Sequence, residues 1–367
     1  MKSLYVHIPF CVSKCLFCSF VISVGQAQRV DDYINALEME AARYQGVPIG
    51  TIYLGGGTPT FLNERQITRV VEIVRRNFKV DQAGEWTIEA NPENLDRSKA
   101  EFLHSIGFNR ISIGMQTFDE RYLKFLGRNH GRDLALEAYD HARQGGFKNI
   151  NVDLMFGFPG QTSDELAADV RTLASLQSEH VSLYNLTIEE KSRFYAQQLK
   201  LDDEEHLAQQ YVLICEFLEG FGFHQYEVSN FCRGNYESRH NTNYWNGSQY
   251  VGLGIGAHGF LNNRRYWNVT KLQDYLFRMK TSQDAVEGLE DLAPETRLME
   301  RILFGLRKNE GICIKEIEDD LGIQLDEQRT SKIEEFIVDG FLIRKKNRIL
   351  ATMKGRLVLD ELSSRLI

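Results

Sequence analysis

The stretch YVHIPFCVSKCLFC, residues 5–18, joins a short strand-like segment to three cysteines. Cys11, Cys15 and Cys18 follow Ser3–Pro9, whose alternating side chains and β-branched residues are typical of a strand. A structural zinc site takes four ligands and a disulfide framework needs pairs. Three thiolates can instead hold a cubane iron-sulfur cluster and leave one iron open to another ligand. The spacing therefore favours an iron-sulfur site at the end of a first strand.

Two other interpretations of these cysteines stay open at this point. They are three buried thiols without a ligand, or a zinc site completed by a distant side chain such as His7. The remaining cysteines are scattered, and we predict that they are small core hydrophobes. They are Cys215, Cys232 and Cys313.

Composition narrows the class of protein. The 367 residues are 43% hydrophobic, which is enough for a sizeable core. Lys and Arg total 43 against 51 Asp and Glu, giving a net charge of −8, and no dense basic cluster would follow a phosphate backbone. Nucleic acid is therefore not an expected partner. The chain runs from Met1 into the first strand without a basic and apolar leader, and no segment approaches the roughly 18 apolar residues that cross a bilayer. We predict a cytoplasmic protein, in a reducing compartment that suits clustered thiols.

Up to about residue 187, short β-branched runs alternate with longer amphipathic stretches. The predicted strands are Leu4–Ile8, Thr51–Leu54, Trp86–Ala90, Arg110–Met115, Ile150–Phe156 and His180–Leu186. The predicted helices are Asp31–Tyr44, Glu64–Phe78, Arg97–Ile106, Asp133–Gln144 and Ser163–Leu176. Strands separated by helices pair in parallel, so the predicted fold class is α/β, a partial (β/α)6 TIM-like barrel with functional loops at the carboxyl ends of the strands.

The pattern changes twice after the barrel region. Residues 188–292 lose the regular alternation and include a predicted helix, Glu204–Glu219, and an aromatic, Gly-rich segment, which we interpret as a barrel extension or cover. Residues 293–367 predict helices followed by a hairpin over Phe341–Ala351, an order typical of a small winged-helix-like domain. Its acidic residues favour a structural or partner-docking role over DNA binding. The predicted domains are thus 1–187, 188–292 and 293–367.

Polar residues gather where the predicted strands end. Gly55-Gly56-Gly57-Thr58-Pro59 follows the second strand, and glycines let a backbone approach a ligand closely. The third, fourth and fifth strands end near Glu89, Gln116 and Asp153, each polar in an apolar run. Because buried polar groups need partners, their convergence predicts a polar ligand. Arg128 would add a partner for a carboxylate.

These motifs resemble those of radical S-adenosylmethionine (SAM) proteins. CVSKCLFC after YVHIP, with GGGTP after the second strand, is similar to the family signature. Four further blocks resemble the branch of that family that contains HemN, the oxygen-independent coproporphyrinogen III dehydrogenases, and HemW, regarded as haem chaperones. They are residues 88–92 (IEANP), 112–118 (SIGMQTF), 126–130 (LGRNH) and 153–162 (DLMFGFPGQT).

The resemblance implies roles for individual residues. Cys11, Cys15 and Cys18 would bind three irons of a 4Fe-4S cluster, and SAM would bind the fourth. In the family, a reducing cluster cleaves this cofactor to a 5′-deoxyadenosyl radical. The residues that fall at cofactor-contacting positions of the branch are Tyr5, Phe17, Gly56, Thr58, Glu89, Gln116, Arg128, Asp153 and Met155.

Three features resemble the haem-chaperone subgroup more than the dehydrogenases. The dehydrogenase pattern has another cysteine two residues after the third, where this chain has Phe20, and it has a long N-terminal extension. Residues 240–245 (HNTNYW) fit the HNxxYW motif associated with haem binding in the chaperones. The haem candidates are His240, Asn241, Tyr244 and Trp245. An imidazole is a normal haem ligand and aromatic rings pack a flat macrocycle, while a hydrogen-bonded structural role for His240 stays open. His258 is a second candidate ligand.

The resemblance therefore implies a haem chaperone, with haem b as its cargo and an apo-haemoprotein as recipient. A membrane-bound recipient and a homodimer stay open. The alternative is an enzyme that uses the radical on a porphyrinogen, such as coproporphyrinogen III, so the sequence leaves undecided whether the chain is a catalyst.

Overall fold

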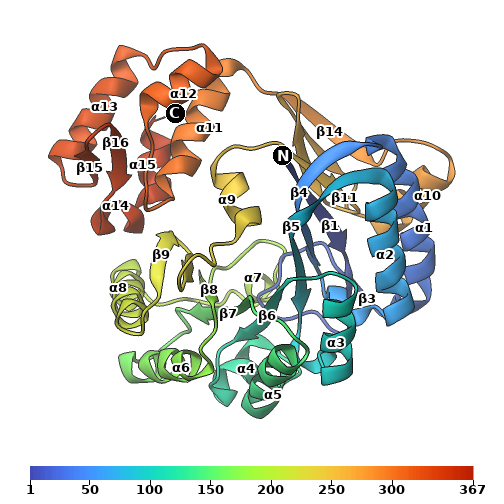
Figure 1. Cartoon of the computed structure of the whole chain (residues 1–367). Helices are drawn as coiled ribbons and strands as arrows, with labels where there is room; N and C mark the ends of the chain where they lie inside the picture. The colour runs from blue at the N-terminus through green and yellow to red at the C-terminus, as the bar shows by residue number, and fades with distance from the viewer. Residues whose placement is uncertain (367) are drawn as a thin grey trace.

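Six parallel strands form the centre of the sheet in the computed structural model, which describes residues 1–366 (Figure 1). They are β1 (Lys2–Ile8), β4 (Val47–Gly56), β5 (Phe78–Ala90), β6 (Arg110–Gln116), β7 (Ile150–Phe156) and β8 (His180–Asn185). Neighbours along this series pair in parallel in chain order. All six predicted strands are present, and β4 and β5 extend beyond the predicted ends. The predicted α/β partial barrel is confirmed.

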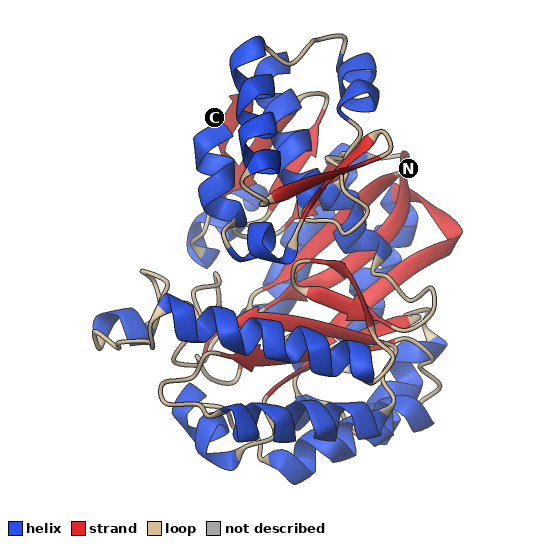
Figure 2. Ribbon diagram, turned by 90° about the vertical axis from the view of Figure 1, so that its left-hand side faces the viewer, coloured by secondary structure: helices blue, strands red, loops and turns tan. Residues whose placement is uncertain are grey.

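Helices cover the outer face of the curved sheet (Figures 1 and 2). Those of the barrel region are α1 (Val30–Ala41), α2 (Glu64–Asn77), α3 (Arg97–Ser105), α4 (Glu120–Leu126), α5 (Arg132–Gln144) and α6 (Ser163–Leu176). Short 3-10 turns are η1 (Ala27–Arg29), η2 (Ala42–Tyr44), η3 (Pro59–Phe61) and η4 (Pro92–Asn94). The main core lies between these helices and the strands, because the strands bury nearly every side chain while the helices bury one apolar stripe each.

Residues 188–292 extend the sheet at both edges. Beyond β8 lie β10 (Asn230–Cys232) and β9 (His224–Glu227), and beyond β1 lie β11 (Tyr250–Leu253), β12 (His258–Leu261), β13 (Arg264–Asn268) and β14 (Val286–Asp291). The helices of this part are α7 (Arg193–Ala196), α8 (Glu204–Gly220), α9 (Arg239–Trp245) and α10 (Leu272–Lys280). A small separate ladder pairs β2 (Phe10–Cys11) with β3 (Ser23–Val24). This region is thus a sheet extension.

The C-terminal part has its own hydrophobic core. It comprises α11 (Pro294–Leu306), α12 (Ile314–Leu321), α13 (Glu327–Val338), β15 (Leu342–Lys345), β16 (Arg348–Ala351), α14 (Met353–Leu357) and α15 (Leu359–Leu366). The three helices and the hairpin appear in the predicted winged-helix-like order, and α9 lies between this unit and the barrel in Figure 1. The domain boundaries stay predictions. Within residues 1–366, every helix is too short or too polar to span a bilayer.

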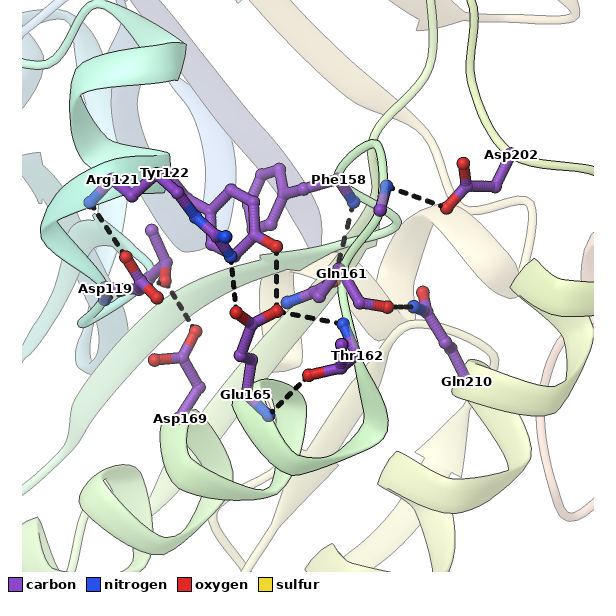
Figure 3. Close-up of polar contacts among 12 residues, drawn as sticks. Asp119, Arg121, Tyr122, Phe158, Gln161, Thr162, Glu165, Asp169, Asp202 and Gln210 are labelled. Atoms are coloured by element: carbon purple, nitrogen blue, oxygen red, sulfur yellow. Dashed lines mark hydrogen bonds and ion pairs between the residues drawn. The ribbon is translucent and has the colours of Figure 1, made fainter.

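The loop after β7 is held by hydrogen bonds from its own side chains and from α8 (Figure 3). The Gln161 side-chain oxygen accepts hydrogen bonds from the Gly157 and Phe158 amides, and Gln210 of α8 donates to the Gln161 carbonyl. Thr162 and Glu165 form a capping box at the start of α6. This network fixes the loop that leaves the β7 end where Asp153 and Met155 lie.

Candidate functional site

Most predicted site residues line one cavity at the carboxyl ends of the central strands. Its volume is about 430 Å³. The predicted residues that line it are Cys11, Cys15, Phe17, Cys18, Gly56, Thr58, Glu89, Gln116, Arg128, Asp153 and Met155. Parallel strands place their following loops at one mouth, so residues distant in sequence meet there. The structure brings these eleven residues to one cavity, and their binding roles stay predictions.

The cysteine loop is held against the GGGTP segment. The Gly57 amide donates to the Ile8 carbonyl at 2.8 Å and the Thr58 amide to the Phe10 carbonyl at 3.0 Å. The Thr58 hydroxyl lies 3.5 Å from the Cys11 sulfur. Burial raises the pKa of Cys11 to about 11. Such a thiol gives up its proton when a metal binds it.

A polar arc connects two of the cysteines. Asn91 donates from its amide group to the Thr58 hydroxyl at 3.0 Å, which leaves that hydroxyl to donate to Cys11. Arg128 donates to the Asn91 side-chain oxygen at 2.9 Å and contacts the Cys15 sulfur at 3.5 Å. Outer contacts of this kind orient metal ligands. The cavity therefore has an ordered shell behind its thiols.

The glycines of GGGTP are required by close packing. A Cβ on Gly57 would lie 2.9 Å from the Cys11 sulfur. Gly56 has φ +115°, and a Cβ there would lie 2.6 Å from the His7 ring. Side chains at these positions would occupy the space between the cysteine loop and the end of β4. The run thus forms a cradle beside the thiols.

Two half-buried carboxyl groups face the cavity. Glu89 accepts hydrogen bonds from the Tyr53 hydroxyl and the Gly56 amide, at 2.8 and 2.9 Å. Asp153 accepts from Ser112 at 3.1 Å and Asn151 at 2.7 Å. Burial raises the pKa of Glu89 to about 7, and it also raises that of Asp153. A cationic ligand would favour the charged form of both.

Gln116 has a backbone conformation that sequence reasoning did not anticipate. Its φ is +71°, and the β6–β7 register shifts between Gly114 and Gln116. A non-glycine residue in this region is uncommon and costs of order 1–3 kcal/mol, and such residues cluster at functional sites. The bulge re-aims the end of β6 so that Gln116 lines the cavity.

Tyr5 is the predicted cofactor residue that lies elsewhere. It lines a neighbouring pocket with His7, Phe20 and His258. Its hydroxyl lies 3.0 Å from His7 Nδ1, and His7 Nε2 lies 2.7 Å from the Val21 carbonyl. Both ring nitrogens of His7 therefore have partners, which disfavours His7 as a zinc ligand. Among residues 1–366, His, Cys, Asp and Glu form no group of three or more suited to a single metal ion.

His240 is buried at the start of α9, with 1% of its surface exposed. Nδ1 lies 2.9 Å from the Thr51 hydroxyl and Nε2 lies 2.9 Å from the Tyr244 hydroxyl. Because Thr51 donates to Ser3, the consistent assignment is that Nδ1–H donates to Thr51 and Nε2 accepts from Tyr244. In this conformation neither nitrogen is free for a metal. The structural interpretation of His240 is favoured.

The other members of HNxxYW are distributed around α9. Asn241 lies in its first turn, half-buried, with its amide donating to the Ser238 hydroxyl. Tyr244 and Trp245 line an aromatic pocket between α9, the sheet extension and α11. Glu85 of β5 accepts from the His240 amide at 2.9 Å, so a buried carboxylate caps this short helix. The motif thus builds one wall of a pocket.

Burial predicts a pH signature for His240. Its pKa falls from 6.5 to about 3 because burial penalises the imidazolium. Between these values the unfolded chain binds more protons, so the stability that neutral His240 contributes is complete above pH 6.5 and declines as the pH falls. We expect the difference in unfolding free energy between wild type and His240→Gln to shrink below pH 6.5, by at most about 1.4 kcal/mol per pH unit. Denaturant unfolding across this range measures it. A pH-independent difference would contradict a buried neutral ring.

Comparisons with known proteins place the chain in a family. Residues 5–173 match the radical SAM superfamily and residues 292–358 the HemN C-terminal domain. The heme chaperone HemW of Bacillus subtilis (strain 168) is 36% identical over 98% of both chains. That of Escherichia coli (strain K12) is 33% identical over 98% of this chain and 96% of its own. This chain belongs to the HemN/HemW branch of the radical SAM superfamily. A solved structure titled coproporphyrinogen III oxidase (HemN) from Escherichia coli, a radical SAM enzyme, matches with a TM-score of 0.88 at 25% identity, covering 100% of this chain and 89% of that one.

Sequence reasoning on this member of the HemN/HemW branch missed several lining residues, and two of them hold predicted site residues. Asn91 and Ser112 line the cavity and bind Arg128 and Asp153, respectively. Both lie inside the quoted blocks IEANP and SIGMQTF. Asn91 lies two residues after Glu89, and Ser112 pairs with Glu89 across β5 and β6. These positions were the signals in the sequence that could have identified them.

Proposed function

We propose that this chain is a haem chaperone that holds a 4Fe-4S cluster and SAM in the central cavity, binds haem, and delivers it to apo-haemoproteins in the cytoplasm. The observation that carries the proposal is the similarity over almost the entire chain to proteins named heme chaperone HemW. The recipient's location, at a membrane or not, and a homodimeric state are further parts of the same proposal.

The cavity fits the cluster. Cys11, Cys15 and Cys18 are free thiols on one wall, with the glycine cradle behind Cys11 and Arg128 beside Cys15. Deprotonated, they would each hold one iron and leave the fourth iron open. The positive charge of Arg128 would stabilise a cluster that carries net negative charge. In this role Asn91 and Thr58 would hold the thiols in position through their hydrogen bonds.

The charges of the cavity also fit SAM. This ligand carries an ammonium group, a carboxylate and a cationic sulfonium. Glu89 and Asp153 supply half-buried carboxylates for cationic groups. Arg128 supplies a guanidinium, whose Nε is buried without a hydrogen-bond partner among the described residues. Phe17 and Met155 add apolar surface. When bound, the cluster supplies the electron that reductively cleaves SAM in this family.

A second function is favoured by one observation. The solved HemN structure matches this chain over its full length, so the same cavity is compatible with radical chemistry on a porphyrinogen. Against it, the dehydrogenase pattern has another cysteine two residues after the third, and this chain has Ser19 followed by Phe20 there. Phe20 is 65% exposed at the mouth of the cavity.

One experiment separates these functions. The cluster is reconstituted anaerobically, haemin is added, and the Soret band is followed before and after adding apomyoglobin as acceptor. In parallel, coproporphyrinogen III is incubated with the protein, SAM and a reductant. We expect haem binding and transfer without conversion of the porphyrinogen. Conversion of the porphyrinogen without haem binding would overturn the chaperone proposal.

A further inference from the structure

We propose that haem binds in the groove between the sheet extension and helices α9 and α11, with the His258 imidazole as an axial ligand of its iron. This inference rests on the proposed chaperone function and adds the binding site. His240, in this arrangement, is a positioning residue that holds Tyr244 in the wall of the groove.

The groove consists of two adjoining pockets. One, of about 410 Å³, is lined by Tyr244, Trp245, Tyr250, Phe260 and Phe304, among others. The second, of about 360 Å³, contains His258 and shares Tyr244 and Tyr250 with the first. A flat macrocycle needs an extended apolar slot with aromatic walls, and the shared tyrosines make the two pockets continuous.

The strand register brings the imidazole to the groove. His258 and Phe260 alternate with Gly259 on β12, so both lie on one face of the sheet. On the neighbouring strands, Tyr250 pairs with Phe260 and Trp267 pairs with His258. The Trp267 ring stacks on His258 with centroids 6.2 Å apart, which fixes one face of the imidazole.

The two histidine candidates differ in access. His258 is exposed and, within residues 1–366, neither of its ring nitrogens makes a hydrogen bond, whereas both nitrogens of His240 have partners. Tyr244 is also engaged, because its hydroxyl contacts His240. Tyr250 is the remaining polar aromatic residue at the junction.

The rim of the groove has the charge that haem propionates require. Three arginines and one glutamate line the first pocket: Arg265, Arg297, Arg301 and Glu300. Arg265 contacts Glu300 at 2.5 Å and Glu290 at 3.1 Å. Arg297 lies over the Phe260 ring, 5.9 Å from its centroid, and forms no ion pair with the described residues. Its guanidinium is therefore available to a carboxylate.

The groove also reaches the central cavity. Ser19 and Phe20 line both the pocket that contains His258 and the cavity that contains the cysteines. These residues follow Cys18 directly, so changes in the cysteine loop would move a wall of the groove. The haem site would in this way lie next to the cluster site.

The test compares full-length, cluster-reconstituted variants titrated with haemin, with difference spectra recorded against haem-free protein. His258→Ala is expected to lose the wild-type Soret position, and added imidazole is expected to restore it, because a free ligand can enter the space that the side chain leaves. Arg297→Gln is expected to weaken binding without changing the Soret position. His224→Ala, which removes a half-exposed histidine on the far edge strand, is the matched control and should behave as wild type.

The outcomes are distinguishable. Wild-type protein that binds no haem would overturn both the chaperone function and this site. Haem binding with an unchanged spectrum in His258→Ala would overturn His258 as the axial ligand while leaving the chaperone function standing. Loss of the band in Tyr250→Phe would then place the ligand at Tyr250 of the same groove. If His258→Ala binds less SAM than wild type, the imidazole rescue separates ligation from misfolding, because only a missing ligand is replaced by imidazole.

Discussion

Cys15→Ala is expected to abolish cluster assembly. Each of the three thiolates would hold a different iron. Removal of one therefore leaves two irons without a protein ligand, and no spare thiolate lies nearby to replace it. The remaining cysteines cannot substitute, because Cys215, Cys232 and Cys313 are buried and none of them lines the cavity. Arg128 would also lose the Cys15 sulfur that it contacts at 3.5 Å. Iron and sulfide content and the charge-transfer absorbance after anaerobic reconstitution measure the loss.

The matched control is Cys313→Ala. This thiol is buried in the C-terminal part, and its replacement removes a similar number of atoms without touching the cavity. We expect Cys313→Ala to assemble a cluster at the wild-type iron content. A Cys15→Ala variant with wild-type iron content and spectrum would refute the assignment of the three cysteines.

The sequence was sufficient for the central fold, since hydrophobic periodicity alone located the six central strands. The alternation of strands and helices also predicts the parallel pairing, because parallel neighbouring strands must be joined by a crossover such as a helix. It was insufficient for the extension. Helix α9 has no apolar period, and beyond its local Ser238 cap it depends on the Glu85 carboxylate of a distant strand. Propensity reasoning has no access to such tertiary contacts.

The site shows the same division. Residues at strand ends, such as Glu89 and Asp153, could be located because a polar residue in an apolar run signals a need for partners. The position of Tyr5 in the neighbouring pocket and the hydrogen bonds at both nitrogens of His240 depend on side-chain geometry. Spacing cannot distinguish a histidine that binds a metal from one that holds a neighbouring ring. His258 carries a weaker sequence signal but is the more accessible of the two candidate ligands.

Gly57→Ala is expected to weaken SAM binding and cluster retention together. The new Cβ would lie 2.8 Å from the Pro9 backbone and 2.9 Å from the Cys11 sulfur, closer than packed atoms allow. The loop cannot retreat freely, because Gly57 and Thr58 donate hydrogen bonds to the carbonyls of Ile8 and Phe10. Overpacking costs about 1–3 kcal/mol, which corresponds to about 5- to 150-fold in an equilibrium constant.

Anaerobic equilibrium dialysis with SAM, together with iron content, measures the effect of Gly57→Ala. Gly220→Ala is the control, because a Cβ there meets no atom within 4 Å and the position ends a helix. We expect the control to bind SAM as wild type does and to be slightly more stable, since Ala replaces Gly in a helix. Wild-type affinity and iron content in Gly57→Ala would mean that the cysteine loop moves away from the end of β4 when the cavity fills. The close packing of GGGTP against Cys11 would then have no part in holding the cofactor.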